Sequence, residues 1–162
     1  MLKIADKMSQ LNIAQLKNLY DSSIRQHANA EYFKLNENLR ILQSEQDFYA
    51  DLEMFFRVKG ARCALWLVDG VYVSGLRAEP YKDGYLITSL ETHPEARRRG
   101  YGTALMKAVS NYFNAVLYSH VNEGNIPSRN LHLRCNFRRT DIPAIFVDGT
   151  VHNDFVIYVL DK

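Results

Sequence analysis

A glycine turn flanked by arginines is the part of the sequence best suited to chemistry. The segment Leu90–Leu105 reads LETHPEARRRGYGTAL, with Pro94 after a predicted strand and with Gly100 and Gly102 before a predicted helix. The first N–H groups of a helix have no partner inside the helix, and the helix dipole adds partial positive charge there. Glycines let a ligand approach these groups closely, so the turn predicts a phosphate site, which Arg97–Arg99 would reinforce.

Two common phosphate-binding motifs do not fit this turn. A dinucleotide-binding turn needs a third glycine where this chain has Leu105, together with a βαβ unit and an acidic residue for the ribose. A nucleoside-triphosphate loop needs Gly-x-x-x-x-Gly-Lys-Ser/Thr, which the sequence lacks. We therefore expect the turn to bind a different phosphorylated ligand.

Positive charge gathers around the same segment. The chain has a net charge of +2, but residues 93–139 hold eight lysines and arginines against Glu95 and Glu123, so this segment carries +6 and the remainder −4. Such a local excess favours an anionic ligand at one site over a whole face for nucleic acid. An arginine-rich solvated surface would have the same composition, and charge alone leaves both interpretations open.

Helices are predicted on both sides of the turn. The spacing of apolar residues indicates one helix over about residues 10–28 and, after a polar stretch at 29–38, a second helix that begins near Ser44 and Asp47. The second helix would have an apolar face made of Phe48, Leu52, Phe55 and Phe56. The helix after the glycine turn would bury Leu105, Met106, Val109, Phe113 and Val116.

Strands are predicted from turn residues and apolar runs. Asp69-Gly70 indicates a hairpin between strands at 61–68 and 71–78, because tight hairpin turns need positive φ. Asp83-Gly84 leads into a third strand at 85–92. The other expected elements are strands at 2–5, 115–121, 144–147 and 154–160, a short helix at 127–134, and a turn at Asp148-Gly149. This order predicts a single α+β domain, residues 1–162, around one mixed sheet.

The length and composition fit a globular protein. The chain has 162 residues, of which 47% are hydrophobic and 23% charged, which argues against a disordered, collagen-like or disulfide-dense protein. Its longest apolar runs are about six residues, against roughly 20 for a membrane span. No signal-peptide core is visible near the start. We therefore expect a cytoplasmic protein that contacts no membrane and keeps Cys63 and Cys135 as reduced thiols.

The glycine turn and its surroundings resemble the GCN5-related N-acetyltransferase (GNAT) family. The family signature Arg/Gln-x-x-Gly-x-Gly/Ala lies at a strand-to-helix turn, and here it reads Arg97-Arg98-Arg99-Gly100-Tyr101-Gly102 after His93-Pro94-Glu95. The segments Asn125–Ser128 and Leu131–Phe137 are similar to the family's second cofactor segment, which often reads Asn…Leu-Tyr-x-Lys-x-Gly-Phe. The resemblance spans most of the chain, but only residues 86–137 are specific.

The resemblance implies both a fold and a co-substrate. The fold would have α/β/α layers, with helices on both faces of a single mixed, mostly antiparallel sheet that contains a splayed central strand pair. The co-substrate would be acetyl-CoA, with its pyrophosphate on amides of the signature turn and its pantetheine arm along a strand edge. The residues expected to bind it are Leu90, Glu91, Thr92, Arg97, Arg98, Arg99, Gly100, Tyr101, Gly102, Thr103, Asn125 and Ser128.

The resemblance also implies acyl transfer to a primary amine of a small molecule or peptide, by direct attack in a ternary complex. Glu91 is the candidate base, although an outward-facing carboxylate paired with an arginine would look the same in sequence. His132 stands where the family usually has the tyrosine that protonates the CoA thiolate, and it is the candidate acid. Tyr158 and Tyr118 are weaker substitutes for that phenol.

The resemblance further implies that the substrate lies near the end of the strand before the signature strand, which makes Arg77 and Tyr81 the candidate substrate residues. Arg77 would hold a substrate carboxylate or form an ordinary ion pair at the hairpin end. Cys135 is not expected to act as a nucleophile, since no histidine with an orienting carboxylate accompanies it in sequence. The scattered histidines and cysteines show no ligand spacing, so no metal is expected.

Two other functions stay open at this point. One is a non-catalytic domain that binds acyl-CoA, because the usual tyrosine is absent. The other is an acetyltransferase toxin that acts on charged tRNA, for which Arg129, Arg134, Arg138 and Arg139 would supply charge. The favoured interpretation is an enzyme for an amine substrate that does not bind nucleic acid and works as a monomer or homodimer.

Overall fold

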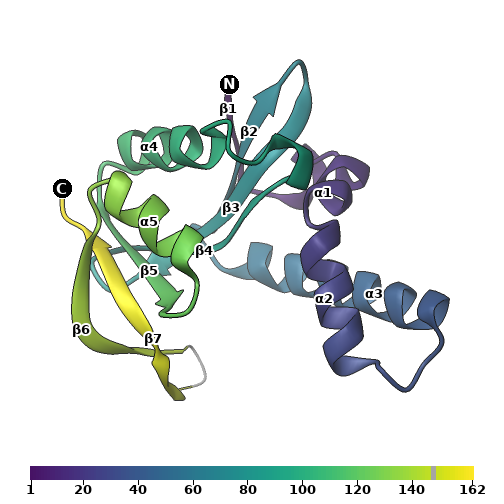
Figure 1. The fold of residues 1–162 in the computed structure, drawn as a ribbon. Coiled ribbons are helices and arrows are strands. Elements are labelled where there is room, and N and C mark those ends of the chain that lie inside the picture. The colour runs from purple at the N-terminus through teal and green to yellow at the C-terminus, as the bar shows by residue number, and fades with distance from the viewer. Residues whose placement is uncertain (147–148) are drawn as a thin grey trace.

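A seven-stranded mixed sheet with helices on both faces organises the chain (Figure 1). The structure is a computed structural model and describes residues 1–146 and 149–162. The strands lie in the order β1-β2-β3-β4-β5-β7-β6, and the one parallel pair among them is β4 with β5. The predicted single mixed, mostly antiparallel sheet is confirmed.

The elements have the following bounds. The strands are β1 (Leu2–Ala5), β2 (Arg62–Val68), β3 (Val71–Tyr81), β4 (Gly84–Thr92), β5 (Val116–Asn122), β6 (Arg138–Ile145) and β7 (Val151–Leu160). The helices are α1 (Ile13–Leu19), α2 (Asp21–Glu31), α3 (Glu37–Arg57), α4 (Tyr101–Phe113) and α5 (Ile126–Arg134), with short 3-10 helices η1 (Met8–Gln10) and η2 (Pro94–Ala96). No described helix has the length and apolar character that crossing a membrane requires.

The single N-terminal helix predicted over residues 10–28 is wrong, because the chain bends at Tyr20. Tyr20 has φ −95° and ψ 8°, and it separates α1 from α2. The bend lets the two helices pack on different partners. Leu16, Leu19 and Ile24 belong to one core cluster, within which α1 lies against β3 and α2 lies against α3. Ser44 of α3 also donates a hydrogen bond to the Ile24 carbonyl oxygen.

The predicted start of the next helix near Ser44 and Asp47 is also wrong. The helix α3 begins at Glu37, where the side chain of Asn36 caps it by accepting a hydrogen bond from the Leu39 N–H at 3.1 Å. Ser44 is instead buried inside α3, and its hydroxyl donates to the Ile24 carbonyl oxygen at 2.7 Å. Its short polar side chain therefore joins two helices rather than starting one.

The strand predictions are largely confirmed. Asp69 and Gly70 have φ +49° and +78°, as the tight turn between β2 and β3 requires. At the next turn the positive φ falls on Lys82, and Gly84 already begins β4. The strand β6 begins at Arg138, well before the predicted strand at 144–147. Val147 and Asp148, with the turn predicted there, lie outside the described residues.

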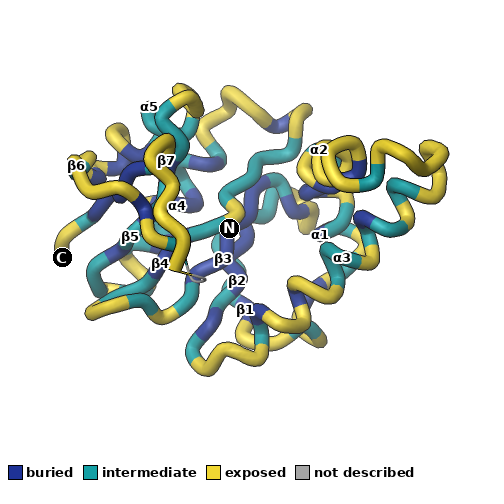
Figure 2. Tube along the Cα trace, turned by 90° about the horizontal axis from the view of Figure 1, so that it is seen from below, coloured by how far each residue is buried: buried dark blue, intermediate teal, exposed yellow. Residues whose placement is uncertain are grey.

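The core has two main parts on opposite faces of the sheet, because successive strand residues point to opposite sides. Ala64 of β2 packs with the α4 cluster that contains Leu105, whereas its neighbours Cys63 and Leu65 pack with the α1–α3 cluster that contains Leu16. Figure 2 shows buried residues running through the strands between these helices and exposed residues along the outer side of α2. The predicted helices on both faces are confirmed.

The parallel pair at the centre of the sheet separates soon after it begins. Pairing runs from Gly84 with Val116 to Ile87 with Ser119. Beyond these positions β4 continues to Thr92 and β5 to Asn122, but the two strands no longer pair with each other in the described sheet. This confirms the splayed central strand pair and leaves one edge of β4 open.

Candidate functional site

A bulge in β4 shapes the open edge of that strand. Two residues, Ser89 and Leu90, lie opposite the single residue Leu76 of β3, and Ser89 has φ +50°. A bulge of this kind bends a strand and re-aims its side chains. Leu90 consequently packs on the α4 side of the sheet, and Glu91 after it reaches the α2 side, where it contacts Ser23.

Tyr20 fixes the bulge from the opposite face. Its phenol donates a hydrogen bond to the Ser89 carbonyl oxygen at 2.8 Å, and only 4% of the residue is exposed. Burial raises the pKa of the phenol, which therefore stays a donor. Ser74 holds the next residue, since its hydroxyl donates to the Glu91 carbonyl oxygen at 2.7 Å. The bend between α1 and α2 thus places a tyrosine where β4 needs a donor.

The glycine turn brings an uncapped helix end to the same edge. Gly100 precedes α4 with φ +83°, and no side chain caps the helix, so its first N–H groups are available to a ligand. A Cβ atom on Gly102 would lie 2.9 Å from Leu131 Cδ1 and 3.2 Å from Thr92 Oγ1. The absence of a side chain at Gly102 therefore lets the helix start approach both β4 and α5.

A cleft of about 1030 Å³ lies between β4, the glycine turn and α5. It is lined by Leu90, Glu91, Thr92, Ala96, Arg97, Arg98, Gly100, Tyr101, Gly102, Thr103, Asn125, Pro127, Ser128, Asn130, Leu131 and Arg134. Every residue expected to bind acetyl-CoA is in this lining except Arg99. Asn125 and Ser128 enter it together, because the Asn125 side chain caps α5 by accepting from the Ser128 N–H at 3.1 Å.

Sequence reasoning missed one wall of the cleft. Pro127, Asn130, Leu131 and Arg134 lie on one face of α5 at helical spacing. That spacing is visible in the sequence, and Arg134 lies both in the segment similar to the family's second cofactor segment and among the arginines considered for RNA. The structure separates it from them.

The arginines of the basic segment have two different surroundings. Arg98 and Arg134 line the cleft, as does Arg97, which donates to the Thr92 carbonyl oxygen at 3.1 Å. Three other arginines form ion pairs outside the cleft: Arg138 with Asp161 at 2.9 Å, Arg139 with Glu123 at 3.0 Å, and Arg129 with Glu123 at 3.8 Å. Within the described residues Arg98 and Arg134 form no ion pair, so their positive charge is available to a ligand in the cleft.

Glu91 lies at the wall of the cleft with both carboxylate oxygens engaged. Ser23 Oγ donates to Oε2 at 2.8 Å, and Arg97 donates to Oε1 at 2.9 Å. The side chain is 18% exposed. The two sequence interpretations are combined here, since this carboxylate is paired with an arginine and also faces the cleft.

His132 is not in the lining of the cleft, and only 1% of the residue is exposed. Its Nδ1 lies 2.8 Å from the Ser128 carbonyl oxygen, which places a proton on that nitrogen. The ring packs against Phe137 and Tyr158 with centroid distances of 5.0 and 5.6 Å. Among the described residues neither His132 Nε2 nor the Tyr158 hydroxyl has a hydrogen-bond partner. The acid role of His132 stays a prediction.

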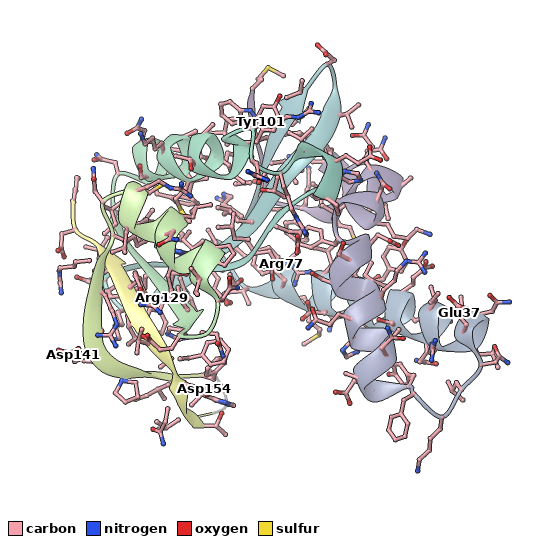
Figure 3. All side chains as sticks on the ribbon, viewed as in Figure 1. Glu37, Arg77, Tyr101, Arg129, Asp141 and Asp154 are labelled. Carbon is pink, nitrogen blue, oxygen red and sulfur yellow. The ribbon has the colours of Figure 1, made fainter. Side chains whose placement is uncertain are left out.

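The candidate substrate residues lie outside the cleft. Arg77, labelled in Figure 3 where the strands meet α2 and α3, is buried and forms an ion pair with Asp51 of α3. Its guanidinium also lies over the rings of Phe48 and Phe55, at 5.7 and 5.4 Å from their centroids. Tyr81 ends β3, with its ring 5.3 Å from the ring of Tyr118.

Hydrogen bonding or burial raises the pKa of three other side chains that could take part in chemistry, Tyr118, Cys63 and Cys135. Tyr118 donates to Asp83, and this hydrogen bond raises the pKa of its phenol to about 12. Burial raises the pKa of the Cys63 thiol to about 12 and also raises the pKa of Cys135. Both cysteines are free and buried. Within residues 1–146 and 149–162, no group of three or more potential ligand side chains is arranged for a metal ion.

Comparison with protein families gives one match over most of the chain. The model described as "Acetyltransferase (GNAT) family" matches residues 22–137, which include α3 to α5, α2 except its first residue, and the cleft. A comparison with curated proteins gave no match.

Solved acetyltransferase structures are similar over nearly the whole chain. PaiA N-acetyltransferase from Thermoplasma acidophilum in complex with coenzyme A has a TM-score of 0.65 and 11% identity, covering 100% of this chain and 99% of that one. An acetyltransferase from Bacillus subtilis in complex with CoA has a TM-score of 0.63 and 12% identity, covering 99% and 97%. Ribosomal-protein-S18-alanine N-acetyltransferase from Escherichia coli has a TM-score of 0.61 and 17% identity, covering 99% and 93%. At these identities the similarity shows the shared fold.

Tyr20→Phe tests whether the phenol fixes the bulge. Loss of its hydrogen bond leaves the Ser89 carbonyl oxygen without this donor, so the free energy of unfolding should fall by about 1 kcal/mol. The dissociation constant for coenzyme A should rise because the open edge of β4 shifts. Urea denaturation and titration calorimetry measure the two effects. Tyr112→Phe, at an exposed position of α4, is the matched control. Unchanged values for Tyr20→Phe would contradict the assignment.

The buried His132 makes stability depend on pH in a known direction. Burial lowers the pKa of the folded imidazole below its unfolded value of about 6.5, so acid favours the unfolded chain in that window. The free energy of unfolding should therefore fall as pH decreases below about 6.5, by up to about 1.4 kcal/mol per pH unit from this group. Denaturation at a series of pH values should show a shallower fall in His132→Gln. Equal slopes would show that His132 does not cause the loss.

Proposed function

The chain belongs to the GNAT acetyltransferase family, and on that premise we propose that it is an acetyl-CoA-dependent N-acyltransferase acting on a primary amine of a small molecule or peptide. One observation carries the proposal: the cleft joins the open edge of β4 to the uncapped start of α4. An extended thiol arm suits the first feature, and a pyrophosphate suits the second.

The residues that would hold acetyl-CoA fit its parts. The first N–H groups of α4 and the side chains of Arg98 and Arg134 would bind the phosphates. The backbone of Leu90 to Thr92 would pair with the amides of the pantetheine arm. When bound, acetyl-CoA supplies an activated thioester, whose carbon–sulfur bond is exchanged for a carbon–nitrogen bond to the acceptor.

Glu91 is the residue we assign to proton removal. An ammonium group cannot attack, so the acceptor must first lose a proton, and the Glu91 carboxylate at the cleft wall accepts it directly or through one water. Arg97 and Ser23 hold the two oxygens of that carboxylate and so fix its orientation. The CoA thiolate that leaves needs one proton in return, supplied by water or by His132, whose ring lies behind Ser128 of the cleft lining.

The ion pairs of the later arginines favour this function over an RNA-directed one. Arg129, Arg138 and Arg139 are already bound to carboxylates, whereas Arg98 and Arg134 line the cleft and form no ion pair within the described residues. The position of Glu91 in the same cleft favours catalysis over simple binding of acyl-CoA. Release of the CoA thiol in the presence of an amine decides between catalysis and binding.

Gly102→Glu tests the cleft as the acetyl-CoA site. In the wild type, acetyl-CoA at about 100 times its dissociation constant should stabilise the fold by roughly 2.7 kcal/mol, which raises Tm by several degrees. The variant places a carboxylate between the α4 N-terminus and Thr92, so this shift should disappear. Asn111→Glu, at an exposed position of the same helix, should keep it. A rise in Tm as large as that of the wild type in Gly102→Glu would show that the turn does not bind the pyrophosphate.

Glu91→Gln tests the base. The amide keeps the size of the side chain but cannot accept the proton, so kcat should fall by about 10²–10⁴ while the dissociation constant for acetyl-CoA changes little. Steady-state kinetics with thiol detection and calorimetry measure the two quantities. Glu95→Gln is the matched control, because Glu95 is exposed and outside the cleft lining. An unchanged kcat would transfer the role of base to water or to another group.

A further inference from the structure

A second cavity, of about 220 Å³, lies between α2 and α3. Its walls include Ser23, Ile24 and His27 from α2, and Asp47, Phe48 and Asp51 from α3. We refer to this cavity as the α2–α3 pocket. None of the residues that line the cleft lines this pocket.

The pocket adjoins the cleft through a single contact. Ser23 lines the pocket, and its hydroxyl donates to Glu91 Oε2 at 2.8 Å. Glu91 in turn lines the cleft. Ser23 is exposed, so a molecule whose reacting amine lies beside Glu91 can extend over Ser23 to the pocket.

The pocket combines apolar walls with carboxylates. Ile24 and Phe48 contribute apolar surface, and Asp47 and Asp51 lie one turn apart on the same face of α3. The carboxylate of Asp51 is bound to Arg77, and its side chain is 68% exposed. Such walls suit a chain of methylene groups that ends in a positive charge.

Asp47 is the carboxylate that lacks a strong cationic partner. Tyr32 donates to it, and the His27 ring nitrogen lies 3.2 Å away. These contacts lower the pKa of Asp47 and keep the group ionised. Within the described residues, its polar contacts otherwise come from Gln43. A ligand ammonium group would therefore meet a negative charge that no guanidinium or lysine already neutralises.

We infer that the α2–α3 pocket binds the distal ammonium group of the acceptor, which makes the substrate a linear diamine rather than a monoamine. The inference rests on the proposed function, because it takes Glu91 as the site of the reacting amine. Ser23 contacts Glu91, and His27 contacts Asp47. Ser23 and His27 are one helical turn apart, which places their Cβ atoms about 5–6 Å from each other. A chain of about four methylenes spans a similar distance between its nitrogens. The distal ammonium keeps its proton and takes no part in bond formation.

The experiment compares two amines that differ only in the second charge. Wild-type kcat/KM is measured for 1,4-diaminobutane and for n-butylamine at saturating acetyl-CoA. We expect the diamine to be preferred by about tenfold or more, mainly through KM, because the charged contact forms on binding. Asp47→Asn should remove most of this preference, whereas Asp21→Asn should keep it.

The matched control is Asp21→Asn, because Asp21 of α2 is only partly buried, pairs with Arg25 and does not line the pocket. The thermal shift with acetyl-CoA must be the same in Asp47→Asn and the wild type, which shows that the variant is folded with an intact cleft. Direct calorimetric titration of 1,4-diaminobutane into the wild type and Asp47→Asn gives a second readout that needs no turnover. A weaker dissociation constant in the variant supports the inference.

The outcomes separate this inference from the proposed function. Equal kcat/KM for the two amines, or a diamine preference that survives Asp47→Asn, would overturn the inference and leave acetyl transfer standing. Acetylation of a lysine-containing peptide, with no turnover of free diamines, would also overturn it. Absence of turnover with every amine, together with no acetyl-CoA shift, would instead contradict the proposed function.

Discussion

The early separation of β4 from β5 is the constraint on which the rest of the structure depends. The two strands pair for four residues each, from Gly84 to Ile87 and from Val116 to Ser119, and then diverge. Backbone groups on the open edge of β4 cannot stay unpaired in a buried sheet, so the edge needs either solvent or a ligand. The cleft lies along that edge, and it brings the uncapped start of α4 to the same ligand.

The N-terminal helices contribute to the site through two hydrogen bonds to β4. The bend at Tyr20 ends α1, and the Tyr20 phenol donates to the Ser89 carbonyl oxygen. About one helical turn later, Ser23 of α2 donates to Glu91. The same bend sets α1 against β3 and α2 against α3. The break in the helix is therefore part of how the site is built.

Signals contained within a few residues were sufficient to predict much of the fold, and partners distant in sequence decided the rest. The Asp69-Gly70 hairpin and the glycine turn depend on local backbone conformation, and both were predicted from residue types alone. The bend at Tyr20 depends on a carbonyl 69 positions away, and the burial of Ser44 depends on one 20 positions away. The orientation of His132 is likewise set by packing against Tyr158, which no spacing in the sequence reveals.

The net charge of a segment can be read from the sequence, but the ion pairs that cancel part of it depend on residues distant in sequence. The sequence places +6 between residues 93 and 139, yet the later arginines are neutralised by Glu123 and Asp161, and the cleft keeps Arg98 and Arg134. On the other side of Glu91, the α2–α3 pocket carries carboxylates. An anionic ligand and a cationic ligand would thus approach from opposite sides and meet at one carboxylate that is bound by an arginine and a serine. Opposite fields on the two sides would orient both reactants before any bond forms, since each is repelled from the other's site.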